Sequence, residues 1–338
     1  MKALVLNDIG KMKIEEREMP KAGSEVSIVK VEACGICSSD IPRAYCDGAH
    51  IMPIVLGHEF AGTDEAGRRV GVYPLIPCMK CECCKARKYE LCRNYLYLGS
   101  RQDGGFAEYA SVPKWNAIEL PNNVTMEQAA MLEPMAVVVH AIRRANPSKD
   151  DNICVMGLGA IGLLTIMFLI EAGFKNVYAI GNKSYQRAIA MELGVLSKNI
   201  CNTNMRDART WLREITGGHG IDVFFECIGK NESINLGIEA AAPEGKICIV
   251  GNPGTDMHFS RETYWKILRN QLKIMGTWNS WFSHDENDDW HYVMSRLEAG
   301  TISPEKLITH RLSLDELPHG FEILRDKSQE YVKIMGGF

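Results

Sequence analysis

The chain has 338 residues, too many for one comfortable hydrophobic core, so two domains are expected. Apolar residues make up 46% of the chain and charged residues 24%, which is typical of an ordinary globular protein. The formal net charge of −4, without long basic runs, gives no electrostatic reason to expect DNA or RNA as a partner.

The first 145 residues contain short alternating or β-rich runs separated by glycine and proline. These runs are KALVLN (2–7), EVSIVKVEACG (25–35), RRVGVYP (68–74) and GGFAEYASVP (104–113). The pattern predicts a mostly β domain. The N-terminal MKALVLNDIG has no apolar stretch of signal-peptide length, so we expect the twelve cysteines to be reduced thiols or metal ligands in the cytoplasm.

A dense cysteine cluster lies within this first domain, in CMKCECCKARKYELC. Four of its members, Cys78, Cys81, Cys84 and Cys92, are spaced so that one loop can wrap four thiolates tetrahedrally around zinc. Because a closed set of four thiolates leaves no position for substrate, the spacing predicts a structural zinc site. Cys83 is expected not to bind metal. Adventitious cysteines and an iron–sulfur cluster are the alternatives.

A second constellation is dispersed along the same domain. It comprises Cys37 in EACGICSSD, His58 and Glu59 in PIVLGHEFAG, and Glu133 in MLEPM. Taken singly, Cys37 also suits a small core residue, His58 a hydrogen-bonded turn, and Glu133 a carboxylate at the start of a helix. Together they offer ligand types that zinc accepts while keeping a position for water or substrate. They predict a catalytic zinc site that eases removal of an alcohol proton, with the hydride passing to a nicotinamide.

From about Asn146 onward, short apolar strands alternate with helical segments. In chain order the segments are NICVMG, AIGLLTIMFLIEAG, NVYAIG, SYQRAIAMELG, IDVFFECIG, NESINLGIEAAAPEG and KICIVG. The alternation predicts βαβ units and a doubly wound parallel sheet with helices on both faces. Residues 153–170 carry no charge and reach the lower length limit of a membrane span, but their glycines favour a buried strand and helix.

The motif GLGAIG follows the strand NICVM directly and opens a helix. In this position Gly157 permits a tight turn, Gly159 lets the backbone approach a pyrophosphate, and Gly162 lets the helix pack closely on the strand. The first helical turn, which includes Ile161, then faces the phosphates. The motif predicts dinucleotide binding.

The tip of the next strand lacks the acid that NAD-binding units usually use to bind the ribose hydroxyls. The strand NVYAI is followed by Gly181, Asn182 and Lys183. Glycine leaves room for a 2′-phosphate, asparagine donates a hydrogen bond and lysine supplies positive charge. We therefore expect NADP(H) to be preferred over NAD(H). The alternative is an exposed turn with an incidental lysine and a relaxed or NAD-preferring site.

The motifs CGICSSD, GHEFAG, the cysteine lobe and GLGAIG, in this order, resemble the zinc-dependent medium-chain dehydrogenase/reductase family over essentially the entire chain. The resemblance implies an α/β protein with a GroES-like, mostly β catalytic domain (1–145 and 278–338) and a Rossmann domain (146–277). It also implies two zinc ions per chain, an active site in the cleft between the domains, and a homodimer or homotetramer. The expected partner is a small molecule, not a nucleic acid or a membrane.

The same resemblance assigns roles to individual residues. Cys37, His58, Glu59 and Glu133 correspond to the catalytic zinc region, with Glu133 as an exchangeable ligand or acting through water. Ser39 matches the proton-relay hydroxyl of the family, whereas Pro42 stands where alcohol dehydrogenases can carry a relay histidine. Glutamate at 59 and at 133 resembles the polyol and threonine dehydrogenase branch.

Three further segments point to a substrate class within that branch. SSDIPRAYCDGAH, GSRQDGGFAEY and WKILRNQLKIMGTW are similar to galactitol-1-phosphate 5-dehydrogenases and sorbitol dehydrogenases. We therefore expect reversible oxidation of a secondary alcohol of a sugar alcohol, or of its phosphate, to a ketose with NAD(P). The alternatives are a threonine-type or simple secondary-alcohol dehydrogenase, a zinc-free quinone-type reductase, and a non-enzymatic zinc-ribbon interaction module on a nucleotide-sensing scaffold.

Five residues are candidate substrate contacts, and surface salt bridges or packing are the alternative explanation for each. The candidates are Arg43, His50, Arg101, Trp278 and Asn279. Two features depart from the family pattern. The segment TDEAGRR (63–69) is shorter than in relatives, which puts the local strand pairing in question. Gly181 stands where the galactitol-phosphate enzymes carry an acid.

Overall fold

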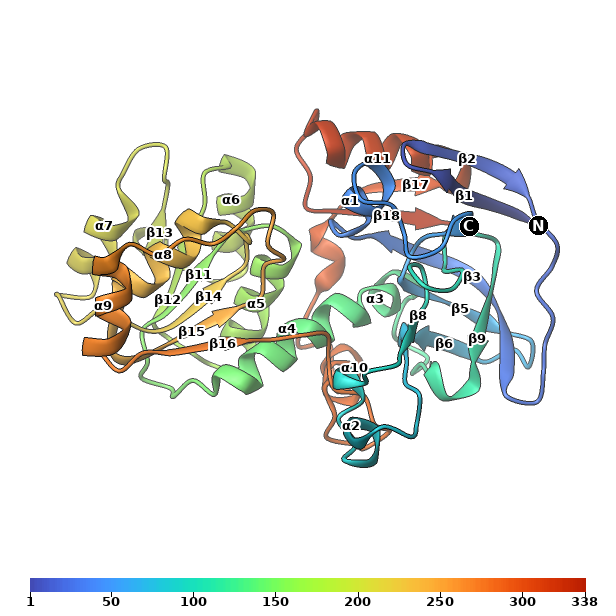
Figure 1. The fold of residues 1–338 in the computed structure, drawn as a ribbon, viewed down its shortest axis with the longest axis horizontal. Coiled ribbons are helices and arrows are strands. Elements are labelled where there is room, and N and C mark those ends of the chain that lie inside the picture. Colours follow the sequence, from blue (N-terminus) through green and yellow to red (C-terminus); the bar gives the residue numbers. More distant parts are fainter. The chain divides into compact units, whose positions relative to one another are not determined.

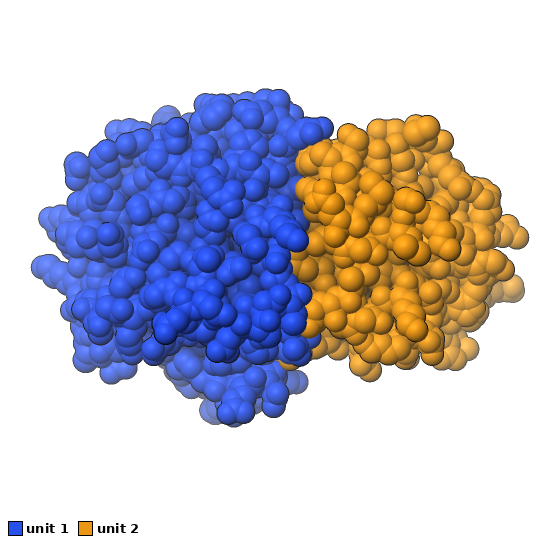
Figure 2. Space-filling view, turned by 180° about the vertical axis from the view of Figure 1, so that it is seen from behind, with its two compact units in different colours: residues 1–136, 280–338 blue, residues 137–279 orange.

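The computed structural model describes residues 1–338. The chain forms two compact units, which Figure 2 distinguishes by colour: residues 1–136 with 280–338, and residues 137–279. The boundary between residues 136 and 137 falls within helix α4 (Leu132–Ala145), so this helix contributes residues to both units. The boundaries at 145/146 and 277/278, which the sequence analysis gives for the catalytic and Rossmann domains, stay a prediction. No helix combines the length and the apolar character needed to cross a lipid bilayer.

The first unit is mostly β-structure (Figure 1). Its strands are β1 Lys2–Asp8, β2 Lys11–Glu16, β3 Val26–Ile36, β4 Ile54–Val55, β5 Glu59–Asp64, β6 Arg69–Val72, β7 Leu75–Ile76, β8 Leu96–Tyr97, β9 Tyr109–Pro113, β10 Ala117–Glu119, β17 Ile308–Ser313 and β18 Lys333–Gly337. Its own helices are α1 Asp40–Tyr45, α2 Glu82–Lys85, α3 Met126–Ala130, α10 Asp289–Glu298 and α11 Leu317–Asp326.

Strand β3 lies at the centre of the seven-stranded sheet of this unit, whose order is β10-β6-β5-β3-β18-β17 with β9 also pairing β3. The C-terminal strand β18 pairs antiparallel with β3, so that Ile334 lies opposite Ile36. The last strand of the chain thus joins the sheet of β3, whereas β1 and β2 form a separate three-stranded sheet with β4. This architecture is the expected GroES-like fold.

The short segment at 63–69 keeps regular strand pairing. Strands β5 and β6 pair antiparallel, with Thr63 opposite Arg69. The Asp64 carboxylate closes the turn by accepting hydrogen bonds from the backbone N–H groups of Ala66 (3.0 Å) and Arg68 (2.9 Å). An aspartate that bonds to backbone two residues on is a common way to stabilise a tight turn. The shortening therefore leaves the ladder between β5 and β6 intact.

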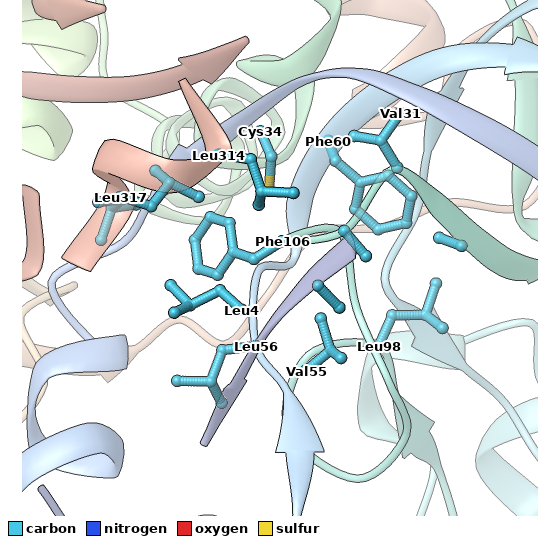
Figure 3. Packing of buried hydrophobic residues seen from close by; sticks show 14 of the residues in the cluster. Leu4, Val31, Cys34, Val55, Leu56, Phe60, Leu98, Phe106, Leu314 and Leu317 are labelled. Carbon is cyan, nitrogen blue, oxygen red and sulfur yellow. The ribbon is translucent and has the colours of Figure 1, made fainter. Parts of the chain in front are cut away.

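The hydrophobic core of the first unit joins distant parts of the chain (Figure 3). Leu4 from β1, Phe60 from β5 and Phe106 from the segment before β9 are at most 1% exposed. The C-terminal Leu317 is fully buried in the same cluster. Burying side chains of this size stabilises the fold by about 1.5–3 kcal/mol each. The core thereby fixes the ends of β3 and β5, where the candidate site lies.

The second unit has a six-stranded sheet that is parallel throughout, in the order β13-β12-β11-β14-β15-β16. Its strands are β11 Ile153–Met156, β12 Val177–Ile180, β13 Ile200–Cys201, β14 Ile221–Glu226, β15 Ala241–Ile249 and β16 Lys273–Gly276. Its helices, besides the end of α4, are α5 Ala160–Glu171, α6 Ser184–Glu192, α7 Ala208–Ile215, α8 Asn231–Ala240 and α9 Arg261–Arg269. The strand order reverses at β11, which is where doubly wound sheets bind nucleotides.

Helices cover both faces of this sheet, as the sequence predicts. Trp211 of α7 and Ile234 of α8 pack with Phe224 of β14 on one face. Cys154 of β11 points toward this helix layer, so its neighbour Val155 points to the opposite face of the sheet. Gly162 of α5 lies against Val155 on that opposite face. One boundary differs from the sequence prediction: the helical segment expected over 231–245 ends at Ala240, because β15 already begins at Ala241.

Candidate active site and nucleotide-binding edge

The four spaced cysteines of the lobe converge. The Sγ atoms of Cys78, Cys81, Cys84 and Cys92 lie within 4.8 Å of one another. The Sγ of Cys84 is 3.5 Å from that of Cys81 and 4.0 Å from that of Cys78. A tetrahedral zinc ion with Zn–S bonds of about 2.3 Å would separate its sulfurs by about 3.8 Å. The thiol cluster therefore fits zinc, and Cys83 lies outside the cluster.

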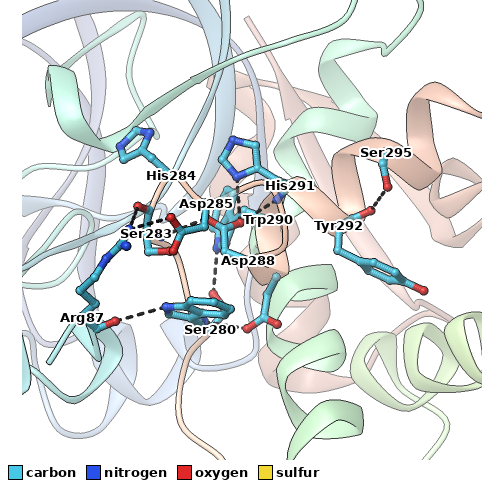
Figure 4. A network of polar contacts seen from close by, with 12 residues as sticks. Arg87, Ser280, Ser283, His284, Asp285, Asp288, Trp290, His291, Tyr292 and Ser295 are labelled. Carbon is cyan, nitrogen blue, oxygen red and sulfur yellow. Dashed lines mark hydrogen bonds and ion pairs between the residues drawn. The ribbon is translucent and has the colours of Figure 1, made fainter.

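The lobe is anchored to a segment near the C-terminal part of the same unit (Figure 4). The guanidinium of Arg87 donates to the carbonyl of Ser283 (3.0 Å) and to the Asp285 carboxylate (2.8 Å). In return the indole of Trp281 donates to the carbonyl of Arg87 at 3.2 Å. The lobe thus braces residues 281–285, which suits a structural function for its metal.

The second cluster forms where two neighbouring strands meet. Cys37 directly follows β3, whereas His58 and Glu59 lie at the start of β5, with Glu59 opposite Gly35 in the ladder. The ligand atoms of Cys37, His58 and Glu59 lie within 4.8 Å of one another. His58 is 3% and Glu59 is 1% exposed. The geometry fits a metal ion held by mixed ligands, and the ligand role of each residue stays a prediction.

Asp40 orients the histidine of this cluster, a role the sequence analysis missed. Its fully buried carboxylate lies 3.4 Å from Nδ1 of His58 and accepts a hydrogen bond from the backbone N–H of Cys37 at 3.1 Å. Burial by itself lowers the pKa of His58, but the charges of Asp40 and Cys37 outweigh burial and raise that pKa well above its usual value. A carboxylate behind a ligating imidazole fixes the ring and increases its basicity. The position of Asp40 three residues after Cys37 is the only sequence signal for it.

Lys333 is a second residue that the sequence analysis missed. Its Nζ forms an ion pair with Oε2 of Glu59 and donates to the carbonyl of Ile36 at 3.2 Å. Lys333 is 3% exposed. A side chain at Gly35 would overlap this ion pair, so glycine is required there. No sequence signal identifies Lys333, because β18 meets β3 only in the folded sheet.

Glu133 lies beside the cluster but outside the group of mutually close ligand atoms. It sits in the first turn of α4, where the hydroxyl of Tyr97 donates to its Oε1 at 3.2 Å. The Tyr97 ring in turn contacts the His58 ring edge-on, with centroids 5.7 Å apart. Burial raises the pKa of Glu133 to about 7, with the charge of Glu59 adding to the shift. A buried carboxyl beside the cluster but outside its group of close ligand atoms suits an exchangeable or water-mediated ligand.

The hydroxyl of Ser39 touches the same centre. It donates to Sγ of Cys37 at 3.2 Å and accepts a hydrogen bond from Nη1 of Arg43 at 2.9 Å. Arg43 also contacts the Asp40 carboxylate at 3.2 Å. The predicted relay hydroxyl is thus held in place by a permanently charged donor.

The remaining predicted substrate contacts fall in two places. Arg43, His50 and Arg101 belong to the first unit, on α1, before β4 and after β8. Trp278 is 50% exposed and Asn279 is 9% exposed, and both end the second unit. The substrate role of all five stays a prediction.

The glycine motif has the features that a pyrophosphate requires. Gly157 has φ +97°, which only glycine adopts without strain, and a side chain at Gly162 would overlap the carbonyl of Gly157. A Cβ at Gly159, the residue before α5, would meet no atom within 4 Å. Ile161 follows in the first turn of α5. An open backbone at a helix N-terminus fits a phosphate group.

The tip of β12 is built from Gly181, Asn182 and Lys183, with no carboxylate among them. Arg187 of α6 reaches back and donates to the carbonyl of Gly181 at 3.3 Å. A Cβ at Gly181 would lie 2.9 Å from two carbons of Leu158, a residue of the glycine motif. Gly181 therefore packs closely against Leu158 of the glycine motif, and the tip of β12 carries no acid.

Known proteins resemble the chain along its whole length. Residues 23–122 match the model of the alcohol dehydrogenase GroES-like domain, and residues 160–299 match that of the zinc-binding dehydrogenases. Galactitol 1-phosphate 5-dehydrogenase of Escherichia coli (strain K12) is 33% identical over 327 residues, which cover 93% of this chain and 94% of that protein.

Two solved structures show the same fold. The crystal structure of galactitol-1-phosphate dehydrogenase from Escherichia coli matches with a TM-score of 0.92 and 31% identity, covering 100% of both chains. A protein described as a zinc-binding dehydrogenase from Sinorhizobium meliloti 1021, bound to NADP, matches with a TM-score of 0.90 and 28% identity, covering 100% of this chain and 99% of that one. With these relatives and the two ligand clusters, the chain belongs to the zinc-dependent medium-chain dehydrogenases of the polyol branch, which are NAD(P)-dependent alcohol oxidoreductases.

Proposed function

We propose that this protein reversibly oxidises a secondary alcohol of a sugar alcohol, or of its phosphate, to a ketose, with two zinc ions per chain and NADP(H) preferred over NAD(H). The observation that carries the proposal is the convergence of Cys37, His58 and Glu59 with the Ser39 hydroxyl directly beside them. This arrangement offers metal ligands and a proton-transferring hydroxyl at one point, which oxidation of an alcohol requires.

Each residue has a defined part in this chemistry. Cys37 and His58 would hold the catalytic zinc, with Glu59 or Glu133 completing the set. Zinc, when bound, supplies Lewis acidity toward the alcohol oxygen, and the nicotinamide accepts the hydride. Ser39 would hydrogen-bond the substrate hydroxyl and take part in moving its proton, while Asp40 keeps the imidazole oriented.

Arg43 positions Ser39 and does not itself carry the proton. Its guanidinium donates to the Ser39 oxygen at 2.9 Å and stays charged at any pH the protein meets. The hydrogen bond leaves the Ser39 proton directed at Cys37 or at a bound alcohol. With Pro42 in place of a relay histidine, solvent is the acceptor we propose beyond Ser39.

The proposed NADP(H) preference rests on the tip of β12. Gly181, Asn182 and Lys183 put no negative charge there, and Arg187 brings a second cation to the same tip. A 2′-phosphate would be stabilised by these donors, whereas an acid would repel it. The NADP-bound relative from Sinorhizobium meliloti is in keeping with this choice.

The structural zinc belongs to the four-cysteine lobe in this proposal. None of the twelve cysteines forms a disulfide, which supports a reducing compartment, and we propose the cytoplasm. The homodimeric or homotetrameric state implied by the family resemblance stays a prediction.

Metal analysis combined with a substrate panel tests the proposal. We expect two zinc ions per chain, chelator-sensitive oxidation of hexitols and hexitol phosphates, and a higher kcat/KM with NADP⁺ than with NAD⁺. One zinc per chain without turnover would instead favour the zinc-ribbon interaction module, and turnover of threonine above every polyol would favour the threonine-type alternative. A strong preference for NAD⁺ would reject the proposed cofactor choice alone.

A further inference from the structure

Tyr97 contacts two residues of the candidate metal centre with the two parts of its side chain. Its hydroxyl donates to Oε1 of Glu133 at 3.2 Å. Its ring lies edge-on to the His58 ring, with centroids 5.7 Å apart and 61° between the ring planes. Edge-to-face contact favours one relative orientation of two aromatic rings. Tyr97 therefore joins a predicted metal ligand to the carboxylate beside the cluster, and no step of the proposed alcohol oxidation accounts for this contact.

The backbone that carries Tyr97 is held on both sides. Strand β8, which Figure 1 labels in the first unit, pairs antiparallel with β7, so that Tyr97 lies opposite Leu75. The carbonyl of Tyr97 accepts hydrogen bonds at 3.2, 2.9 and 3.2 Å from the backbone N–H groups of the following turn, Ser100, Arg101 and Gln102. A strand end closed by such a turn leaves the backbone little freedom. Of the two hydrogen-bonded side chains, Tyr97 is thus the fixed member and Glu133 the movable one.

The two carboxylates of the metal centre are held by different kinds of partner. Glu59 forms an ion pair with Lys333, and both residues are at most 3% exposed. Glu133 is 7% exposed and forms no ion pair, so the neutral hydroxyl of Tyr97 holds its carboxylate. Breaking a buried ion pair leaves an uncompensated charge, whereas one hydrogen bond from a neutral donor is exchanged at a much lower cost. Glu133 is therefore the carboxylate that can change partner, and Tyr97 is the group that competes for it.

Glu133 does not complete the metal cluster in the conformation that Tyr97 holds. The mutually close ligand atoms belong to Cys37, His58 and Glu59, and the carboxylate of Glu133 lies outside that group. Rotation about the side-chain bonds of Glu133 can move its carboxylate while α4 stays in place. A zinc ion that acts on a substrate has three protein ligands and one position for water or substrate, and a fourth protein ligand would close that position. Where Glu133 lies thus decides whether the alcohol oxygen can reach the metal.

We propose that Tyr97 is a positioning residue that holds Glu133 off the catalytic metal, so that one coordination position stays open for the alcohol. The inference rests on the catalytic zinc of the proposed function and adds the residue that keeps its site open. It assigns the effect to the hydroxyl of Tyr97, whereas the ring supplies the packing against His58. A partner that only supports the ligands has the opposite effect, because its loss weakens metal binding by about 10–100-fold. The direction of the change in metal release therefore separates the two roles.

The decisive experiment measures metal release from the full-length, zinc-loaded protein into an excess of chelator. Tyr97→Phe removes only the hydroxyl and keeps the ring beside His58. The kinetic phase that is missing in Cys37→Ser belongs to the catalytic site. In Tyr97→Phe this phase should slow about tenfold, because the released Glu133 adds a ligand, and kcat should fall because the alcohol has to displace that ligand. Tyr95→Phe is the matched control, since it removes a hydroxyl from the neighbouring ring and should leave the release rate unchanged.

A double variant shows whether the effect passes through Glu133. In a Glu133→Gln background, Tyr97→Phe should have no further effect on metal release, because an amide is a poor zinc ligand. Release from Tyr97→Phe at the wild-type rate or faster overturns the inference, as does slowing that persists in the Glu133→Gln background. If release slows through Glu133 but no polyol is oxidised, the proposed function fails and the inference stands. A wild type that binds only the metal ion of the cysteine lobe overturns both.

Discussion

Replacing Lys333 by methionine removes the counter-charge of a buried carboxylate. Glu59 is 1% and Lys333 is 3% exposed, so the substitution leaves Glu59 without its ion-pair partner in the interior. Removing one member of a buried pair typically costs about 3–5 kcal/mol, because the remaining charge is uncompensated. For a unit of this size that cost lowers the melting temperature by about 6–20 °C. We expect a shift on the order of 10 °C in a thermal scan at fixed zinc concentration.

The double variant Glu59→Gln/Lys333→Met removes both charges and should recover a substantial part of the melting temperature lost in Lys333→Met. Lys13→Met is the matched control, since Lys13 is 70% exposed in a surface pair with Glu15 and should cost under about 1 kcal/mol. A Lys333→Met protein that melts with the wild type would refute the reasoning, as would a double variant that is less stable than Lys333→Met.

The difference in melting temperature between wild type and Lys333→Met should depend on pH with a defined sign. Burial favours the neutral amine of Lys333, but the charges of Glu59 and Cys37 outweigh burial and raise its pKa above the ordinary value. A raised pKa in the folded state means that the stabilisation is complete below the unfolded pKa and is lost as pH rises through the folded value. The gap in melting temperature between wild type and Lys333→Met should therefore stay constant between about pH 6 and about pH 9.

Three further predictions address the metal clusters and the nucleotide edge. Cys84→Ser should lower the zinc content and cost folding or assembly, whereas Cys37→Ser should remove turnover and one zinc from a still folded protein; the reverse pattern in metal analysis and circular dichroism would overturn the assignment. Gly181→Asp should reduce the NADP⁺ to NAD⁺ ratio of kcat/KM by at least tenfold, although Leu158 has to shift to admit the new Cβ; an unchanged ratio would argue against the proposed cofactor choice. Glu226, which is 1% exposed and accepts hydrogen bonds from the loop after β14, including the N–H of Gly229 at 2.9 Å, should act as a positioning residue. Because Glu226 lies opposite Met156 at the end of β11, Glu226→Gln should raise the dissociation constant for the dinucleotide about tenfold in fluorescence titration, and equal binding by variant and wild type would contradict a positioning role.

The local pattern of residues was sufficient to predict the α/β fold and the glycine turn. Alternation of apolar strands with helices depends on side chains a few residues apart, so it can be read along the chain. Gly157 shows the same principle, because its φ of +97° is a local requirement of a strand-to-helix turn. The spacing of Cys78, Cys81, Cys84 and Cys92 likewise anticipated a cluster that one short loop can form.

Contacts across the sheets were decided only by the tertiary structure. The ion pair between Glu59 and Lys333 depends on β18 returning to β3, and the contact of Tyr97 with Glu133 depends on a turn meeting the first turn of α4. Lys333 and Tyr97 carry no local signal of these contacts, since lysines are usually exposed and tyrosines occur both in the interior and at the surface. Arg101 illustrates the remaining step: the sequence marked it as a candidate contact, but only the folded chain places its guanidinium 4.6 Å from the centre of the Tyr95 ring. Residue type and spacing thus determined the chemistry available, whereas long-range packing decided which partners those residues meet in the folded protein.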